Sequence, residues 1–170
     1  MSIIKNISTY LLSKKESPKT VKQFFSWNQL SIVLIICYDN QLSDIVDFIN
    51  ACKVDNISVH VAVIFNGKLE QAPKPHFEHS ILDQKQFSFF NLPNETIIQK
   101  INAKSFDLLI NLGDSEQMQS LALCKLVAAK CKLSNFQNSI FDMTIEKDDS
   151  MNISNYLKQV ILYLKMIKTK

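Results

Sequence analysis

Residues 31–40 read SIVLIICYDN and residues 106–114 read FDLLINLGD, and these two stretches decide the fold. Both are short runs of aliphatic residues without strict alternation, which is typical of strands buried on both faces of a parallel sheet. A third run, ISVHVAVIF at residues 57–65, is rich in β-branched residues and ends in the turn-forming pair Asn66-Gly67. We therefore predict three central strands in these stretches.

Segments in which apolar residues recur at helical spacing follow these strands. The residues predicted to open these helices by capping are Ser43, Asn94 and Asp114, the last with Gln117 in a capping box. Strands that alternate with helices predict right-handed crossovers and helices on both faces of the sheet. The expected fold is α/β, a Rossmann-like three-layer sandwich with a mostly parallel sheet of five to six strands.

The remaining strands are less regular in sequence. We predict a strand at residues 87–90, and two more near residues 132–136 and 140–145. The last two are separated by only a few residues, which favours a hairpin or a locally mixed sheet. Residues 68–86, which contain Pro73 and Pro75, are expected to form a long loop with at most a short extended piece.

Residues 1–22 are predicted to be a basic amphipathic helix preceding a single domain at residues 23–170. Apolar residues recur at helical spacing from Ile3 to Leu11, and Ser17-Pro18 ends the pattern. The chain carries a formal charge of +3, and the whole positive excess lies in this segment. Its lysines form a predicted electrostatic patch: Lys5, Lys14, Lys15, Lys19 and Lys22. The favoured interpretation packs the apolar face on the domain, and the alternative places the helix on an anionic membrane or a nucleic-acid backbone.

The composition is that of an ordinary globular domain. The chain has 170 residues, of which 46% are hydrophobic and 21% are charged. No apolar run is long enough to cross a membrane, and the first residues are too polar for a secretory signal, so we expect a cytoplasmic protein. The four cysteines, which lack metal-ligand spacing, are expected to be free thiols: Cys37, Cys52, Cys124 and Cys131.

Polar residues follow two of the central strands at the point where a Rossmann-like sheet reverses its strand order, which is where such folds bind ligands. The candidate cleft residues are Asp39, Asn40, Asn111, Gly113, Asp114 and Ser115. One interpretation is structural, with Gly113 serving the turn and Asp114 capping the helix. The other is a cleft in which Asp39 and Asp114 hold a polar ligand or Mg²⁺.

Several chemistries are disfavoured by the residues present. Two glycines cannot form a dinucleotide or Walker loop, and without any arginine a phosphate site has no bidentate donor. His76 and His79 have a spacing that suits zinc, but in a proline-containing loop we expect them to be solvated. We therefore expect no cofactor and no metal, and the catalytic residues, if any exist, are unknown.

The chain resembles an uncharacterised family of short Bacteroidetes-type α/β proteins, which implies a bacterial source. The resemblance rests on three stretches: FDLLINLGDSEQMQSLALCKLVAAKCKLSNF (106–136), IFDMTI (140–145) and ISNYLKQVILYLKMI (153–167).

Residues 106–136 also show partial similarity to the N-terminal half of heptosyltransferase-type glycosyltransferases. Gly113-Asp114-Ser115 is similar to the motif of GDS serine hydrolases, but a base would have to come from His60, His76 or His79.

Three hypotheses about function follow. The first is a non-catalytic module that binds a small polar ligand or a protein partner. The second is a small hydrolase or transferase that uses Asp39 and Asp114. The third is a peripheral module that residues 1–22 attach to a membrane or to nucleic acid. The sequence leaves the oligomeric state open.

Overall fold

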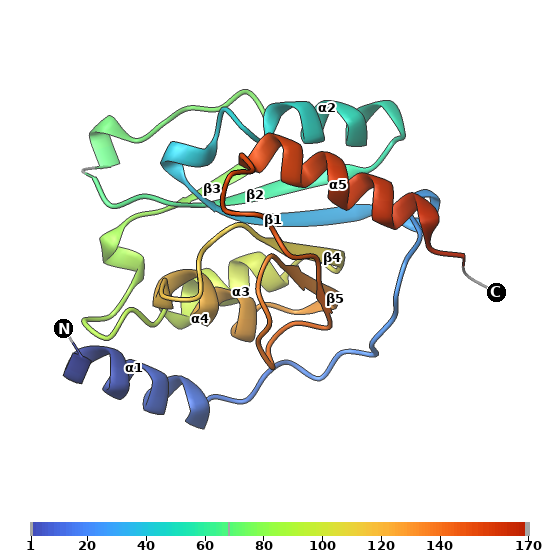
Figure 1. The fold of residues 1–170 in the computed structure, drawn as a ribbon. Coiled ribbons are helices and arrows are strands. Elements are labelled where there is room, and N and C mark those ends of the chain that lie inside the picture. The colour runs from blue at the N-terminus through green and yellow to red at the C-terminus, as the bar shows by residue number, and fades with distance from the viewer. Residues whose placement is uncertain (1, 68, 169–170) are drawn as a thin grey trace.

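The computed structural model of the chain describes residues 2–67 and 69–168. In this part of the chain a six-stranded parallel sheet has the order β3-β2-β1-β4-β5-β6 (Figure 1). The strands are β1 (Ile32–Tyr38), β2 (Ser58–Ile64), β3 (His79–Leu82), β4 (Phe106–Asn111), β5 (Ala129–Ser134) and β6 (Met143–Thr144). The order reverses between β1 and β4, as in the Rossmann fold. The predicted α/β fold is confirmed.

Helices cover both faces of the sheet (Figure 1). On one face lie α2 (Val46–Val54) and α5 (Ile153–Met166), and on the other lie α3 (Glu95–Asn102) and α4 (Met118–Leu126). Successive side chains of β1 enter opposite cores: Val33, Ile35 and Cys37 face α2 and α5, and Leu34 and Ile36 face α3 and α4. This alternation is the pleat of a strand that is buried on both sides.

Two helices begin with an asparagine cap, and the first of these caps is one that the sequence predicts. Asn94 accepts a hydrogen bond from the backbone N–H of Ile97 at 2.9 Å, so it opens α3 as predicted. Asn152 caps α5 in the same way through the N–H of Asn155. The predicted cap at Ser43 is wrong, because α2 begins at Val46 after a turn.

Two strand predictions are corrected by the structure. The third strand is β3 at His79–Leu82, whereas Phe87–Phe90 enters a tight turn closed by the Ser88 N–H on the Leu92 carbonyl. The expectation that the last two strands form a hairpin or a locally mixed sheet is also wrong, because β6 pairs with β5 in parallel. Residues 135–142 reverse the chain twice, and the Asp142 N–H returns to the Lys132 carbonyl.

The segment that follows β4 also differs from the prediction. The helix predicted to open at Asp114 begins only at Met118 and ends at Leu126, and Ala129 already opens β5. Asn102 and Lys132 satisfy carbonyls at the carboxyl end of α4, since Asn102 Nδ2 donates to Leu126 and Lys132 Nζ to Lys125.

The N-terminal helix is shorter than predicted. It forms α1 (Ser2–Lys14), and residues 15–26 then run extended along the domain toward β1 (Figure 1). This strap, defined as residues 15–26, covers the start of β5: Thr20 Oγ1 donates to the Ala129 carbonyl and the Gln23 N–H to Lys130. Met1 from the predicted helix, and residues 68, 169 and 170 of the predicted domain, lie outside the described residues.

Candidate functional site

The carboxyl ends of β1 and β4 lie side by side, as the sequence predicts for the candidate cleft. They are tied together by Gln41, a residue that the sequence analysis did not single out. Its Oε1 accepts the Tyr38 N–H at 2.8 Å and its Nε2 donates to the Leu112 carbonyl at 3.0 Å. Both ends of the Gln41 amide are therefore used in joining the two strand ends.

Asn111 is fully buried, and its polar groups are used within its own turn. Its Oδ1 accepts the Gly113 N–H at 3.1 Å, and its Nδ2 donates to the Gly113 carbonyl at 3.2 Å and to Ser134 Oγ at 3.4 Å. A ligand would have to break these bonds to reach the amide. Asn111 thus shapes the turn and offers no free group to a cleft.

Gly113 is required by close packing. A Cβ at this position would lie 2.3 Å from Oγ of Ser120, a fully buried residue in the first turns of α4. Its φ is not positive, so the constraint is space and not backbone conformation. The structural interpretation of Gly113 is therefore supported.

The remaining predicted cleft residues lie outside the core. Asp114, Ser115 and Asn40 are exposed, and Asp39 is partly exposed at the start of a short 3₁₀ turn, Asp39–Gln41. The Asp114 N–H donates to Gln117 Oε1 at 2.7 Å, which is one half of the predicted capping box, but α4 begins only at Met118. Their assignment to a ligand stays a prediction.

The structure has a hollow elsewhere, between α2 and residues 73–77. Its volume is about 590 Å³. Its apolar lining consists of Leu42, Val46, Ile49, Pro73, Pro75 and Phe77. Ser43, Asn50, Lys53, Lys74 and His76 supply the polar lining. Its titratable side chains are all bases, so the hollow combines an apolar wall with a basic rim.

The hollow exists because of how β2 connects to β3. Parallel strands usually need a crossover helix, but residues 65–78, in the part that the structure describes, contain only a 3₁₀ turn at Leu69–Gln71. A loop cannot cover the flank of α2 as a helix would, and the Val46 side chain stays 42% exposed. The sequence signal was the missing helical pattern in residues 68–86, which predicts the loop but not the space beside it.

A second polar cluster joins β2 to β3. His60 is buried, its Nε2 lies 3.0 Å from Ser80 Oγ, and its Nδ1 lies 3.3 Å from the Glu78 carboxylate without forming an aligned hydrogen bond. Glu78 also pairs with Lys104. The order serine, histidine, carboxylate is that of a nucleophilic triad.

The position of this cluster favours a structural role. His60 and Ser80 lie in the first half of β2 and β3, whereas ligands in such sheets bind at the carboxyl ends. Ser80 also lies within a strand and not on an exposed strand-to-helix turn. His60 does not serve as a base for Ser115, because its Nε2 already contacts Ser80 Oγ.

The His60 cluster predicts acid sensitivity. Burial lowers the pKa of His60 to about 4, with Lys104, His79 and Lys100 acting in the same direction. The unfolded chain therefore takes up this proton near pH 6.5 and the folded chain only near 4, so stability falls as the pH drops through that window. Because the Glu78 carboxylate opposes the shift of the His60 pKa, we expect the free energy of unfolding to fall by about 1–2 kcal/mol.

Urea unfolding of wild type and His60→Gln at pH 7 and 4.5 measures this loss of stability. Identical losses in both proteins would contradict the prediction.

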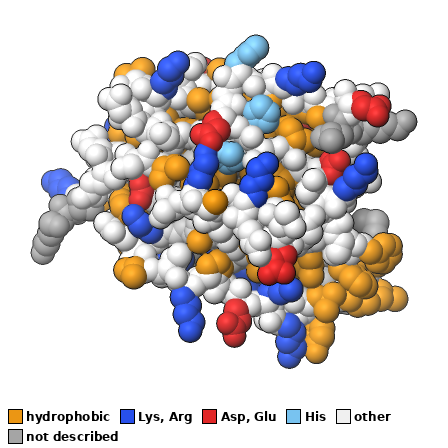
Figure 2. Space-filling model, turned by 180° about the vertical axis from the view of Figure 1, so that it is seen from behind, with side chains coloured by type: hydrophobic (Ala, Val, Ile, Leu, Met, Phe, Trp, Pro, Cys, Tyr) orange, Lys and Arg blue, Asp and Glu red, His pale blue; other side chains and the backbone are white. Residues whose placement is uncertain are grey.

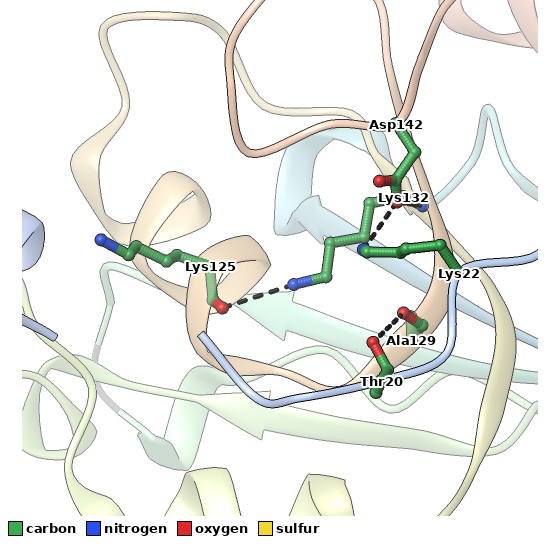
Figure 3. A network of polar contacts seen from close by, with 6 residues as sticks. All are labelled: Thr20, Lys22, Lys125, Ala129, Lys132 and Asp142. Atoms are coloured by element: carbon green, nitrogen blue, oxygen red, sulfur yellow. Dashed lines mark hydrogen bonds and ion pairs between the residues drawn. The ribbon is translucent and has the colours of Figure 1, made fainter. Parts of the chain in front are cut away.

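Lys132 is a buried lysine beneath the strap (Figure 3). Its ammonium donates to the Lys125 carbonyl at 3.3 Å, and its backbone N–H donates to the Asp142 carboxylate, which also pairs with Lys22 at 2.8 Å. Burial lowers the pKa of Lys132 to about 8, and Lys22 adds to the effect. At 4% exposure the amine caps α4 and is closed to a substrate.

The five lysines of the predicted patch do not form one free surface. Lys5 pairs with Glu116 and Lys22 with Asp142. Lys14 lies over the Tyr10 ring at 5.3 Å, and Lys15 and Lys19 are exposed on the strap. Within the described residues, the lysines of the patch that form no ion pair are therefore Lys14, Lys15 and Lys19.

Comparison with known families agrees with the resemblance seen in the sequence. Residues 2–167 match the model of a family of unknown function, DUF6913. The chain belongs to DUF6913. Membership of DUF6913 brings no activity with it. No curated protein matches the chain, and the similarity to heptosyltransferase-type enzymes has no support.

Among the described residues, no helix is both long enough and apolar enough to span a bilayer.

Proposed function

We propose that this domain is a non-catalytic binding module that holds a small amphipathic anion in the hollow between α2 and residues 73–77. The observation that carries the proposal is the hollow itself, about 590 Å³ with an apolar wall. Ligand pockets typically have volumes of about 300–1,000 Å³ and mostly apolar linings with a few polar groups. The hollow has both properties.

The charge of the lining supports an anion. Lys53, Lys74 and His76 are the titratable residues of the lining, and none of the lining residues is acidic. A carboxylate or sulfonate at the rim meets these cations while its apolar body contacts Val46, Ile49 and Phe77. The proposed chemistry is binding alone, because the one hydroxyl of the lining, that of Ser43, forms no hydrogen bond with His76 or with either lysine.

The enzymatic alternative at Asp39 and Asp114 has weaker support. Gln41 and Asn111, the amides between the two strand ends, are already hydrogen-bonded to backbone. Neither aspartate lines the hollow.

The proposed site of action is the cytoplasm. All four cysteines are free and buried: Cys37, Cys52, Cys124 and Cys131. Burial raises the pKa of the Cys37 and Cys52 thiols to about 12, so both stay protonated at neutral pH. Free structural thiols suit a reducing compartment.

An anionic aromatic probe tests the proposal. 1-Anilinonaphthalene-8-sulfonate has the required apolar body and negative charge, and we expect it to shift NMR amide signals of α2 and residues 73–77. Val46→Glu puts a carboxylate into the lining at a partly exposed position, and we expect it to weaken binding about tenfold or more, or over 1.4 kcal/mol. Val54→Glu is the matched control, since Val54 ends the same helix, is 79% exposed and lies outside the lining.

Two outcomes would contradict the proposal. The first is a probe that shifts signals elsewhere and leaves α2 unchanged. The second is equal binding by wild type, Val46→Glu and Val54→Glu. Lys53→Gln and Lys74→Gln test the charge separately, and each is expected to weaken binding several-fold because it removes a cation from the rim.

A further inference from the structure

Helix α1 docks on the domain through only one side. Ser8 is fully buried and Leu12 is 6% exposed, and the Leu12 carbonyl accepts a hydrogen bond from Lys125 Nζ at 2.8 Å. Thr9 Oγ1 lies 3.8 Å from the sulfur of Met118 at the start of α4. Leu12 packs with residues of α4 in a small separate core. The docked side is thus marked by Ser8 and Leu12, one helical turn apart.

The opposite side of α1 carries the more apolar stripe. Ile3, Ile7 and Tyr10 recur at helical spacing and are 74%, 39% and 61% exposed, and Ile4 beside them is 39% exposed. Figure 2 shows hydrophobic side chains gathered at the lower right, at the end of the molecule where α1 lies. The expectation that this face packs on the domain is therefore wrong. The described part of the chain covers Ile4 and Ile7 only in part and leaves most of Ile3 and Tyr10 exposed.

Lysines flank this stripe, and two acids from other elements lie near them: Glu116, which pairs with Lys5, and Glu95, which lines a hollow with Lys15 and Lys19. Helix α1 contains no acidic residue, and Lys14 at its end lies over the Tyr10 ring. Lys15 and Lys19 continue from it along the exposed part of the strap, with Glu16 as the single acid there. No ion pair engages Lys14, Lys15 or Lys19 within residues 2–67 and 69–168.

We propose that the outward stripe of α1 rests on an anionic lipid surface, with its isoleucines at the acyl boundary and these three lysines against the headgroups. An amphipathic helix lying in the plane of the interface has this combination of an apolar face and flanking lysines. Anionic headgroups complement the lysines, and the isoleucines gain an apolar environment.

A second copy of the chain is a poorer occupant. A two-fold interface would bring together the same patch of both copies, and with it the lysines of both copies. The stripe is also small, since a helix of 13 residues is about 20 Å long and one face of it covers roughly 200 Å², whereas a stable dimer buries about 800 Å² on each partner. Nucleic acid would use the lysines but not the isoleucines, and the stripe has a single aromatic ring for base stacking.

Vesicle flotation of the full chain tests the proposal. We expect binding to vesicles containing phosphatidylglycerol at low salt, and at least about tenfold weaker binding to pure phosphatidylcholine or at high salt. Ile3→Ser/Ile7→Ser is expected to lower binding about tenfold, because both side chains leave the acyl boundary. Leu162→Ser is the matched control, an apolar residue 59% exposed on α5. Thermal unfolding checks that each variant is folded.

The charge is tested with Lys14→Gln/Lys15→Gln/Lys19→Gln, which is expected to abolish the preference for anionic vesicles. The proposal is overturned if the wild type fails to float with anionic vesicles, or if the isoleucine variant floats as well as the Leu162→Ser control. Loss of a sedimenting dimer in the isoleucine variant, or RNA binding lost in the lysine variant with unchanged flotation, would also overturn it. None of these measurements depends on the hollow beside α2.

Discussion

Replacement of Asp107 by alanine is expected to lower the free energy of unfolding by about 3 kcal/mol, the largest effect that the structure predicts. Asp107 is 6% exposed near the start of β4. Its carboxylate accepts the backbone N–H groups of Ser31 at 2.9 Å and Ile32 at 3.2 Å, and it pairs with Lys130 at 2.9 Å. One side chain therefore holds the starts of β1, β4 and β5 together.

The size of the effect follows from what the substitution leaves behind. Without the carboxylate, two backbone donors and one ammonium lose their acceptor, and a buried group left unpaired costs about 1–3 kcal/mol. Lys130 recovers part of this cost from water, because its side chain is 39% exposed. The N–H groups of Ser31, which is exposed, and Ile32, which is partly exposed, also recover part of the cost from water.

The pH dependence gives an independent check. Burial by itself would raise the pKa of Asp107, but hydrogen bonds from Lys130, Ser31 and Ile32 hold it below its usual range. The stabilisation is then complete above the unfolded pKa near 3.8 and is lost as the pH falls below it. Urea unfolding of wild type and Asp107→Ala should therefore converge in strong acid. Asp149→Ala, at an exposed position, is the control and is expected to stay within about 0.5 kcal/mol. A loss below 1 kcal/mol at pH 7 would contradict the prediction.

Gly113→Ala is expected to cost about 2–3 kcal/mol, the second largest effect. The new Cβ would lie 2.3 Å from Ser120 Oγ and 2.8 Å from Ser120 Cβ. Ser120 cannot swing away freely, because it is fully buried and its hydroxyl donates to the Gln117 carbonyl at 2.9 Å. The strain therefore pushes α4 away from the end of β4.

A second substitution tests that cause. Ser120→Gly removes the clashing atoms. In that background, Gly113→Ala should therefore cost less than it does in the wild type. Gly67→Ala is the comparison, because its Cβ would meet the tip of the Phe65 ring, an atom that can move. Equal losses at Gly67 and Gly113, or no coupling in the double variant, would contradict this account. Thermal or urea unfolding is measured for the four variants and the wild type.

The candidate cleft shows how far strand ends can be predicted. Asp39 and Asp114 were expected to follow adjacent strands, and β1 and β4 are indeed neighbours. What the pattern could not show was the use of Gln41 and Asn111 as hydrogen-bonding partners of the backbone between them. Such bonds depend on side-chain rotamers and on distances between segments about 70 residues apart.

Strand β3 shows the limit of periodicity. Central strands can be recognised in the sequence because both of their faces are buried and their residues are mostly apolar. Strand β3 lies at the edge of the sheet, and its residues His79, Ser80 and Ile81 are only partly buried. Its four residues carry no sustained apolar pattern, whereas Phe87–Phe90 is aromatic enough to resemble a strand and is in fact a turn. Edge strands owe their existence to pairing with a neighbour, which is a tertiary property.

The sequence by itself determined the α/β class, the parallel central strands and the free, buried thiols, because continuous apolar runs can be satisfied only between two covered faces. The tertiary structure alone decided which side of α1 faces outward and that a hollow lies beside α2. Periodicity shows that a helix has an apolar face, but not which surface meets it. In α1 the burial of Ser8 and the packing of Leu12 on α4 leave Ile3, Ile7 and Tyr10 exposed. Beside α2, the described residues between β2 and β3 form no α-helix that would cover Val46.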